Sequence, residues 1–434
     1  MLEKLETYKV DMGKCFRCSL CKMVPLPVVK SSAFVDNCPI SRYYHFHTYS
    51  GSGQQFMALA ATEGRSDPDE QTAKVAFSCR SCGYCEVACK FIMDVDRHKI
   101  NVAFREYLVR SGLSPTDHMK AVKNLNSKGS IIENPKRLPG SWAQGLGLKV
   151  LPLQKASVLI WAGCVQRDDD KAAQTANTLA RLLLEAGVDV GILGDKEPCC
   201  GLPAYWRGYG DDFTEIVFKN TDLLNRLGVK TIITVSGSCL GSFRNIYPQY
   251  GSSPEPQVLH ATEYLLQLVK RKKLKLKHPI NATVTYHDPC YLGRQSQPDA
   301  KWKGEEKKAF GQLVYWDPPK EINYGTKGVY DAPRELIKAI PGITFHEMYR
   351  IREYAFCCGA GGGITNDTAD MARQTALHRI DEAIDVGARS LVTACSHCQN
   401  HFTQSLKNSE MDHKITITDV IDLVAQSIGI EPSS

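Results

Sequence analysis

Two trios of cysteines near the N-terminus stand at CxxCxxC spacing. One begins at Cys15 and the other at Cys79, and each is followed by one further cysteine. Three thiolates at this spacing hold one corner of an iron–sulfur cubane, and in two-cluster ferredoxins the distant fourth cysteine completes the other cluster. A pair of structural zinc sites is the alternative, but zinc needs no third cysteine at the same spacing. We therefore expect two 4Fe-4S cubane clusters, one held by Cys15, Cys18, Cys21 and Cys89, and the other by Cys79, Cys82, Cys85 and Cys38.

A Cys-Cys-Gly triplet occurs twice in the rest of the chain. It begins at Cys199 and again at Cys357, where further glycines follow as far as Gly363. Adjacent thiolates can bridge or ligate neighbouring irons, and glycines let the backbone lie against a bulky inorganic core. A phosphate loop is a weaker interpretation of the glycine run, because neither GxGxxG nor GxxxxGK[ST] is present. The triplets therefore predict further iron–sulfur chemistry.

The composition favours a globular chain of two or three domains, with 434 residues, 43% hydrophobic and 23% charged. The formal net charge of +6 is modest, and bound clusters with thiolate ligands would offset much of it, so nucleic-acid binding is not implied. No apolar run approaches the roughly 18–20 residues of a membrane span, and the start lacks the pattern of a signal peptide. We expect a cytoplasmic protein whose 17 cysteines bind metal in preference to forming disulfides.

Helices are expected to carry the N-terminal cysteines. A long spacer separates the two trios, and Gln54 to Ala60 within it reads as a helix. Ile100 to Val109 continues the helical pattern. Residues 1–110 are therefore expected to form an all-helical, ferredoxin-like domain with two clusters. Residues 111–155, rich in Gly, Pro, Ser and Asn, read as a linker with short helices.

An internal repeat follows the linker. Each copy has an apolar strand that ends at a cysteine (156–164 and 282–290), a Cys-Cys-Gly triplet, a second strand (230–235 and 389–394) and a closing helix (261–266 and 418–423). Strands that alternate with helices predict parallel sheets, with ligand loops at the carboxyl ends of the strands. We expect two α/β units, at 156–278 and 279–434. Residues 295–328 read as an insertion in the second unit, either a solvated loop or a partner contact.

The second repeat resembles the cysteine-rich CCG domain of the heterodisulfide reductase family. The resemblance rests on Cys290, on Cys357-Cys358-Gly359 and on Cys395-Ser396-His397-Cys398. With the N-terminal domain in front, the whole chain resembles the fused D-type catalytic chain of that family. It is similar also to the iron–sulfur subunits of anaerobic glycerol-3-phosphate dehydrogenase, lactate-oxidising complexes and sulfate-reducer membrane complexes.

The resemblance implies a noncubane 4Fe-4S centre in the second unit that clamps and splits a disulfide. Its ligands would be Cys290, Cys357, Cys358, Cys395 and Cys398. In the first unit Ser236 stands where the first of the paired cysteines is expected. A neutral hydroxyl is a poor iron ligand. The remaining thiols would hold a cubane, a modified noncubane centre with a serine ligand, or nothing; they are Cys164, Cys199, Cys200 and Cys239.

The expected function is that of an oxidoreductase subunit. Electrons would pass through the two cubanes to the noncubane centre, which would act on a thiol/disulfide pair. His287 and His397 flank the expected ligands and are either proton donors or packing residues. The alternatives are a non-catalytic electron conduit and a zinc scaffold. The resemblance implies a flavoprotein or a membrane quinone or cytochrome subunit as partner, which would bring the chain to the inner face of the membrane.

Overall fold

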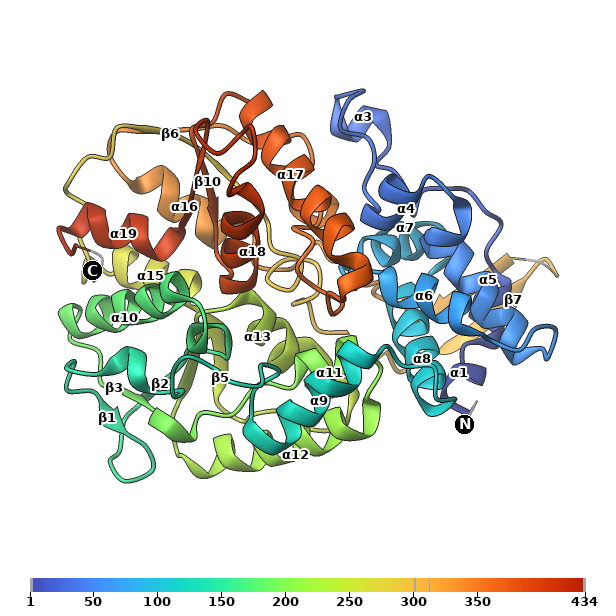
Figure 1. Ribbon diagram of the computed structural model, residues 1–434, viewed down its shortest axis with the longest axis horizontal. Coiled ribbons are helices and arrows are strands. Elements are labelled where there is room, and N and C mark those ends of the chain that lie inside the picture. The colour runs from blue at the N-terminus through green and yellow to red at the C-terminus, as the bar shows by residue number, and fades with distance from the viewer. Residues whose placement is uncertain (1–2, 300–301, 312, 432–434) are drawn as a thin grey trace.

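The computed structural model describes residues 3–299, 302–311 and 313–431. A helical N-terminal region is followed by two α/β units with parallel sheets (Figure 1), which confirms the expected fold class. Within the described residues, no helix is both long and apolar enough to cross a bilayer.

Eight short helices form the N-terminal region. Helix α5 contains the expected helix at 54–60, and α8 contains the one at 100–109. The Ser50 hydroxyl caps the N-terminus of α5 by accepting a hydrogen bond from the Gly53 N–H. The Asp69 carboxylate caps α6 in the same way, by accepting a hydrogen bond from the Thr72 N–H. Ala58, Ile100 and Phe104 are fully buried between these helices. The helices are α1 (Glu3–Glu6), α2 (Lys9–Gly13), α3 (Leu26–Val29), α4 (Pro39–Tyr44), α5 (Gly51–Thr62), α6 (Glu70–Ser78), α7 (Tyr84–Met93) and α8 (Arg97–Arg110).

The first α/β unit has a five-stranded parallel sheet in the order β1-β3-β2-β4-β5. Its central strands are buried on both faces, as in most parallel sheets. The segment expected to be a linker with short helices provides helix α9 (Thr116–Lys128) and the edge strand β1. The strands are β1 (Lys149–Val150), β2 (Val158–Trp161), β3 (Val190–Ile192), β4 (Thr231–Thr234) and β5 (Gln257–His260), and the helices α10 (Asp170–Glu185), α11 (Leu202–Trp206), α12 (Gly210–Arg226), α13 (Gly237–Gly241), α14 (Tyr247–Gln249) and α15 (Ala261–Lys270).

The second unit repeats the first with a four-stranded parallel sheet in the order β11-β10-β6-β9. The closing helix begins later than expected, because Thr418 and Asp419 end β11 and the Asp419 carboxylate caps α19. One hydrophobic core runs through both units. The strands are β6 (Ala282–Tyr286), β9 (Ile343–Phe345), β10 (Ser390–Thr393) and β11 (Thr416–Asp419), and the helices α16 (Asp331–Ala339), α17 (Ala369–Asp385), α18 (Ser396–Leu406) and α19 (Val420–Ile428).

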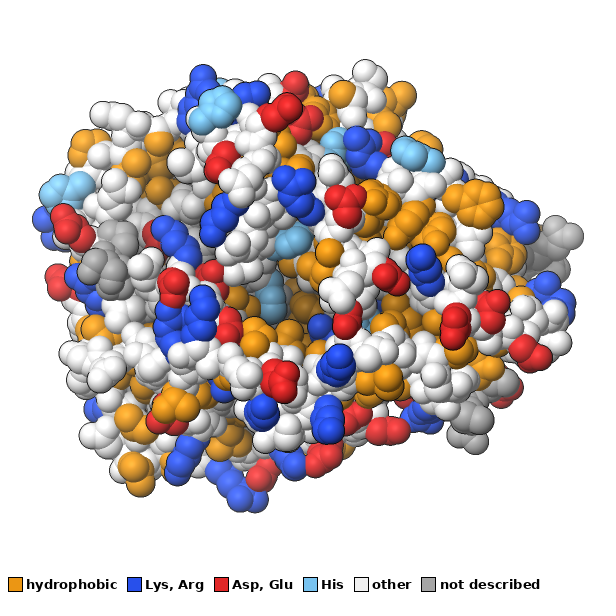
Figure 2. Space-filling model, in the orientation of Figure 1, with side chains coloured by type: hydrophobic (Ala, Val, Ile, Leu, Met, Phe, Trp, Pro, Cys, Tyr) orange, Lys and Arg blue, Asp and Glu red, His pale blue; other side chains and the backbone are white. Residues whose placement is uncertain are grey.

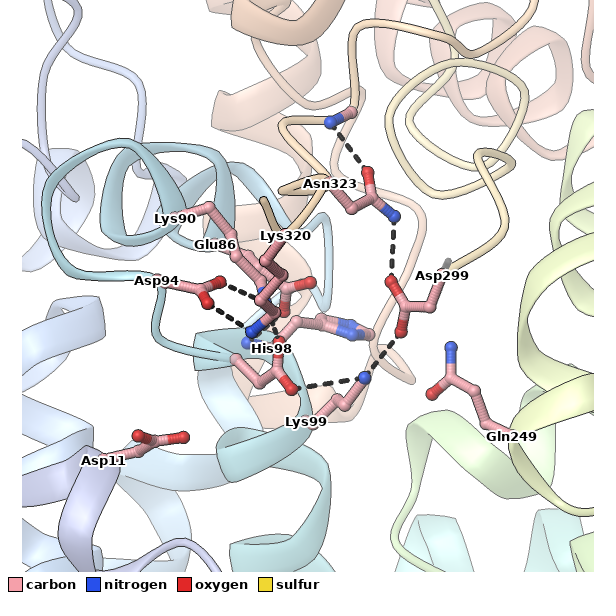
Figure 3. A network of polar contacts seen from close by, with 12 residues as sticks. Asp11, Glu86, Lys90, Asp94, His98, Lys99, Gln249, Asp299, Lys320 and Asn323 are labelled. Carbon is pink, nitrogen blue, oxygen red and sulfur yellow. Dashed lines mark hydrogen bonds and ion pairs between the residues drawn. The ribbon is translucent and has the colours of Figure 1, made fainter. Parts of the chain in front are cut away.

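The insertion at 295–328 reaches back to the N-terminal region. It contains an antiparallel hairpin of β7 (Glu305–Ala309) and β8 (Leu313–Asp317), which is largely exposed. The insertion is held at both ends by ion pairs: the Lys99 ammonium lies 2.6 Å from Asp299, and Lys320 pairs with Asp94 (Figure 3). The insertion therefore ties the second unit to helices α7 and α8.

Arg105 contacts all three parts of the molecule: the N-terminal region, the first α/β unit and the second α/β unit. This α8 side chain is fully buried, and its guanidinium donates to the carbonyls of Cys79 at 2.6 Å, Trp206 at 2.5 Å and Gly362 at 3.1 Å. The glycine run packs closely there: Gly362 has φ +75°, and a Cβ on it would lie 2.2 Å from the Cys79 carbonyl oxygen. The run therefore lets two backbones meet beside the second cysteine trio.

His118 on α9 gives a pH-dependent contribution to stability. Its Nε2 lies 3.0 Å from the Gly363 carbonyl, and burial, with Arg207 nearby, lowers its pKa from 6.5 to about 3. Above pH 6.5 the imidazole is neutral in both folded and unfolded chains. Below pH 6.5 only the unfolded chain takes up the proton, so the free energy of unfolding falls by about 1.4 kcal/mol per pH unit from this group.

We expect His118→Gln to reduce the slope of the free energy of unfolding against pH between pH 6.5 and 5 by the contribution of one proton, about 1.4 kcal/mol per pH unit. His98, His260 and His378, whose pKa values are also lowered to about 3, keep the remaining slope. Unfolding in urea at several pH values measures this slope. The exposed His413, replaced by glutamine, is the control. An unchanged slope in His118→Gln contradicts the assignment.

Candidate iron–sulfur sites

The second cysteine trio surrounds an enclosed cavity. Cys79, Cys82 and Cys85 lie on the loop from α6 into α7, and Cys38 comes to the same cavity from the start of α4. Gly51 makes room beside them, because a Cβ there would lie 2.8 Å from the Cys85 Cβ. Cys21 of the first trio also lines the cavity, so five thiols surround it, and four thiols are the donor set that a cubane needs. The residues predicted for this cluster therefore fit it.

The first trio lies closer to the surface. Cys89 lies one turn after Cys85 on α7. Burial, together with the negative charges of the first trio's thiolates, raises the pKa of the Cys89 thiol to about 12. Cys18 is the one exposed cysteine among the described residues, Cys15 and Cys89 are partly buried, and Cys21 is buried. The structure thus brings together all four predicted ligands, and this set reaches the protein surface.

The five cysteines of the second unit converge on one site. They come from three loops: Cys290 after β6, Cys357 and Cys358 on the glycine-rich loop, and Cys395 and Cys398 at the start of α18. Their thiols are consecutive neighbours: Cys357 lies beside Cys290 and Cys358, and Cys398 lies beside Cys358 and Cys395. The loops follow the carboxyl ends of parallel strands, where the repeat predicted a ligand site.

His287 faces this site as a neutral imidazole, and within the described part of the chain its buried Nε2 has no hydrogen-bond partner. A ring nitrogen of His287 and the sulfurs of Cys358 and Cys398 all lie within 4.8 Å of one another. The guanidinium Nε of Arg379 donates to His287 Nδ1 at 3.3 Å, and arginine does not lose its proton. The Nδ1 atom therefore accepts, and Nε2 carries the hydrogen. The neighbouring Cys357 and Cys398 thiols, and then the His287 imidazole, hold the pKa of Cys358 well below its usual range.

A buried ion-pair network fixes Arg379. Arg379, Arg350 and Glu382 are fully buried, and each guanidinium lies 2.6 Å from Glu382. Burial alone would raise the pKa of Glu382, but the two arginines lower it. The sequence reasoning missed all three residues. The sequence offers one local indication of this network, the spacing of Arg379 and Glu382 three positions apart on α17. Such pairs are also common on exposed helix faces.

The four cysteines of the first unit also form one set. Cys199 contacts Cys164 and Cys200, and Cys200 contacts Cys239. Ser236, however, is turned toward the other unit, with its hydroxyl oxygen 3.4 Å from Cys395 Sγ. In return, the His397 imidazole from the second unit hydrogen-bonds the Cys164 sulfur. At their boundary, each unit therefore places a polar side chain against a cysteine of the other unit.

The second trio touches the site of the second unit. Cys82 packs against Cys357 in one buried cluster, and this neighbour, together with burial, raises the pKa of Cys82 well above its usual range. Arg294 holds the junction, because its guanidinium donates to the Cys82 carbonyl at 2.7 Å and to the Ala355 carbonyl at 2.8 Å. Cysteines from the N-terminal region and from the second unit are thus direct neighbours.

The cysteine sets coincide with two known domain families. A 4Fe-4S dicluster domain matches residues 11–92, and a cysteine-rich domain of the CCG type matches twice, over residues 158–244 and 284–403. The D-type chain of dihydromethanophenazine:CoB–CoM heterodisulfide reductase from Methanosarcina mazei is 28% identical, over 97% of this chain and 95% of that protein. The chain is a homologue of this D-type chain of heterodisulfide reductase. The resemblance seen in the sequence is confirmed.

Other relatives show that this architecture occurs in larger proteins. The probable iron–sulfur-binding oxidoreductase FadF of Bacillus subtilis is 30% identical over 87% of this chain and 50% of that protein. The EtfAB:quinone oxidoreductase of Syntrophomonas wolfei is 28% identical over 86% of this chain and 51% of that protein. The chain therefore spans about half the length of these two relatives. It is an iron–sulfur subunit of the oxidoreductase type, related to electron-transfer proteins.

Proposed function

We propose that the chain is a heterodisulfide reductase-like subunit that passes electrons through two cubane clusters to a noncubane 4Fe-4S centre, where a thiol/disulfide pair reacts. The cubanes would be held by Cys15, Cys18, Cys21 and Cys89 and by Cys38, Cys79, Cys82 and Cys85, and the noncubane centre by Cys290, Cys357, Cys358, Cys395 and Cys398. The observation that carries the proposal is the direct contact of Cys82 with Cys357, because it makes the last cubane ligand set a neighbour of the reactive set.

The overall reaction is the two-electron reduction of a disulfide. The sulfur–sulfur bond breaks, each sulfur gains one electron and one proton, and two thiols leave; the reverse reaction forms the disulfide. The bound cluster would supply single electrons and hold the substrate sulfur. The protein would supply the buried pocket, the His287 imidazole beside Cys358 and Cys398, and the neighbouring arginines. Proton delivery by His287 or His397 stays a prediction.

Electrons would enter or leave at the Cys15 set, because this set reaches the surface. Large apolar side chains are exposed in the same region of the chain, including Phe16 at 62%, Leu26 at 58% and Phe46 at 64%. Figure 2 shows hydrophobic side chains gathered over the N-terminal helices on the face drawn there. An exposed apolar surface of this kind is typical of a contact with another protein. A flavoprotein or a membrane quinone or cytochrome subunit would dock here.

A second function is favoured by Ser236. Without a fifth thiol, the first unit does not repeat the reactive ligand set of the second. The chain could then be a conduit that links a flavoprotein or a quinone-reactive partner to another enzyme, without thiol chemistry of its own. The FadF and EtfAB:quinone oxidoreductase relatives are compatible with either function.

Metal analysis and electron paramagnetic resonance on anaerobically purified protein test the proposal. We expect iron and sulfide near the roughly 12 atoms per chain that three 4Fe-4S clusters hold, little zinc, and one signal that changes when a thiol is added. Zinc in place of iron would contradict the whole assignment. Iron with no thiol-dependent change would favour the conduit over the enzyme.

A further inference from the structure

The boundary between the two α/β units places two serine hydroxyls on one cysteine of the other unit. The oxygen of Ser236 lies 3.4 Å from Cys395 Sγ, and that of Ser238 lies 3.6 Å from the same sulfur. All three residues are buried, at 1%, 4% and 2% exposure. The contact is therefore shielded from water.

Ser236 and Cys395 are equivalent positions of the repeat. Ser236 precedes α13 after β4, and Cys395 precedes α18 after β10, and both are N-cap residues. A serine at this position usually accepts a hydrogen bond from the first turn of its helix. Ser236 makes no such bond. Its hydroxyl is turned toward the sulfur instead.

Close packing of the units sets this geometry. A Cβ on Gly237 would lie 2.7 Å from the Leu292 Cβ, and one on Gly241 would lie 2.6 Å from the Tyr291 carbonyl oxygen. These glycines on α13 let the segment after Cys290 approach the helix. The first unit therefore faces the reactive ligand set of the second at short range.

We propose that Ser236 and Ser238 are positioning residues of the first unit that donate hydrogen bonds to the Cys395 sulfur and so raise the reduction potential of the centre in the second unit. The inference rests on the proposed function, since Cys395 must be a cluster ligand. A ligating cysteine is a thiolate without a hydrogen, so only the hydroxyls can donate. Hydrogen bonds to the ligand sulfurs stabilise the more negative, reduced form of an iron–sulfur centre. The missing fifth thiol of the first unit then becomes a functional feature of the second.

The test is an electron paramagnetic resonance redox titration of Ser236→Ala, Ser238→Ala and the double variant in the full chain. We expect the potential of the thiol-sensitive centre to fall in each single variant and to fall further in the double variant. Iron content and the potentials of the two N-terminal cubanes should match the parent protein. Ser236 makes no capping bond, so its removal should leave α13 intact.

Ser242→Ala is the matched control. Ser242 is also buried in the first unit, but its hydroxyl donates to the Cys200 carbonyl and, within the described residues, has no hydrogen bond to a sulfur. Unchanged potentials in both serine variants, or an equal shift in Ser242→Ala, would overturn the inference alone. Loss of iron from Ser236→Ala would overturn it in favour of a serine ligand. Absence of the thiol-sensitive centre from the parent protein would overturn the proposed function as well.

Discussion

Replacing Cys358 by serine is expected to remove the thiol-dependent signal and to bring disulfide turnover to background, while the signals of both N-terminal cubanes remain. Cys358 lies beside Cys357, Cys398 and His287, and these neighbours hold the pKa of its thiol well below the usual range. A serine hydroxyl at this position is a poor iron ligand. Iron analysis should show a loss of about four atoms per chain, the content of one cluster.

Cys200→Ser is the matched control, because Cys200 is the equivalent cysteine of the first unit. It contacts Cys199 and Cys239 and is equally buried. We expect it to retain the thiol-dependent signal. If the N-terminal signals disappear in Cys358→Ser, the division of the chain into cubane and reactive parts is wrong. If Cys200→Ser loses turnover completely, the first unit takes part in the chemistry.

The grouping of the cysteines was predictable because the motifs that carry them depend on local spacing. CxxCxxC trios, the repeated triplet and the strand that precedes each cysteine are all visible in short stretches of sequence, and the structure brings each predicted set together. The parallel sheets follow from the alternation of apolar strands and amphipathic helices. These features need no knowledge of how distant parts of the chain meet.

The contacts between the sets were not predictable, because they depend on packing. Ser236 reads as a lost ligand in the sequence, and only the approach of the two units shows that its hydroxyl meets Cys395. Arg379 precedes no motif, yet it determines which nitrogen of His287 carries the hydrogen. The glycine run was expected beside an inorganic core, and part of it packs against the Cys79–Arg80 backbone. Tertiary packing decides each of these points.

Arg105→Leu is expected to destabilise the junction of the three parts more than any exposed substitution on the same helix. Arg105 is buried without a carboxylate partner, and its charge is balanced by carbonyl oxygens of Cys79, Trp206, Gly362 and Ala76. Leucine would leave these oxygens without a donor in a dry site. At about 1–3 kcal/mol for each buried acceptor left unpaired, the loss should reach roughly 3 kcal/mol or more.

Thermal unfolding and limited proteolysis of cluster-loaded protein measure this effect. Arg110→Leu is the control, since Arg110 lies on the same helix but forms partly exposed ion pairs with Glu106 at 3.2 Å and Asp211 at 2.9 Å, each worth at most about 1 kcal/mol. Arg105→Lys keeps the charge but loses the planar fork, so it should fall between the two. Because Arg105 holds the Cys79 loop against Gly362, we also expect slower electron transfer from the N-terminal cubanes to the thiol-sensitive centre in Arg105→Leu. Equal melting temperatures for the Arg105 and Arg110 variants would show that the junction is held elsewhere, and the insertion tied by Lys99 and Asp299 would be the next element to test.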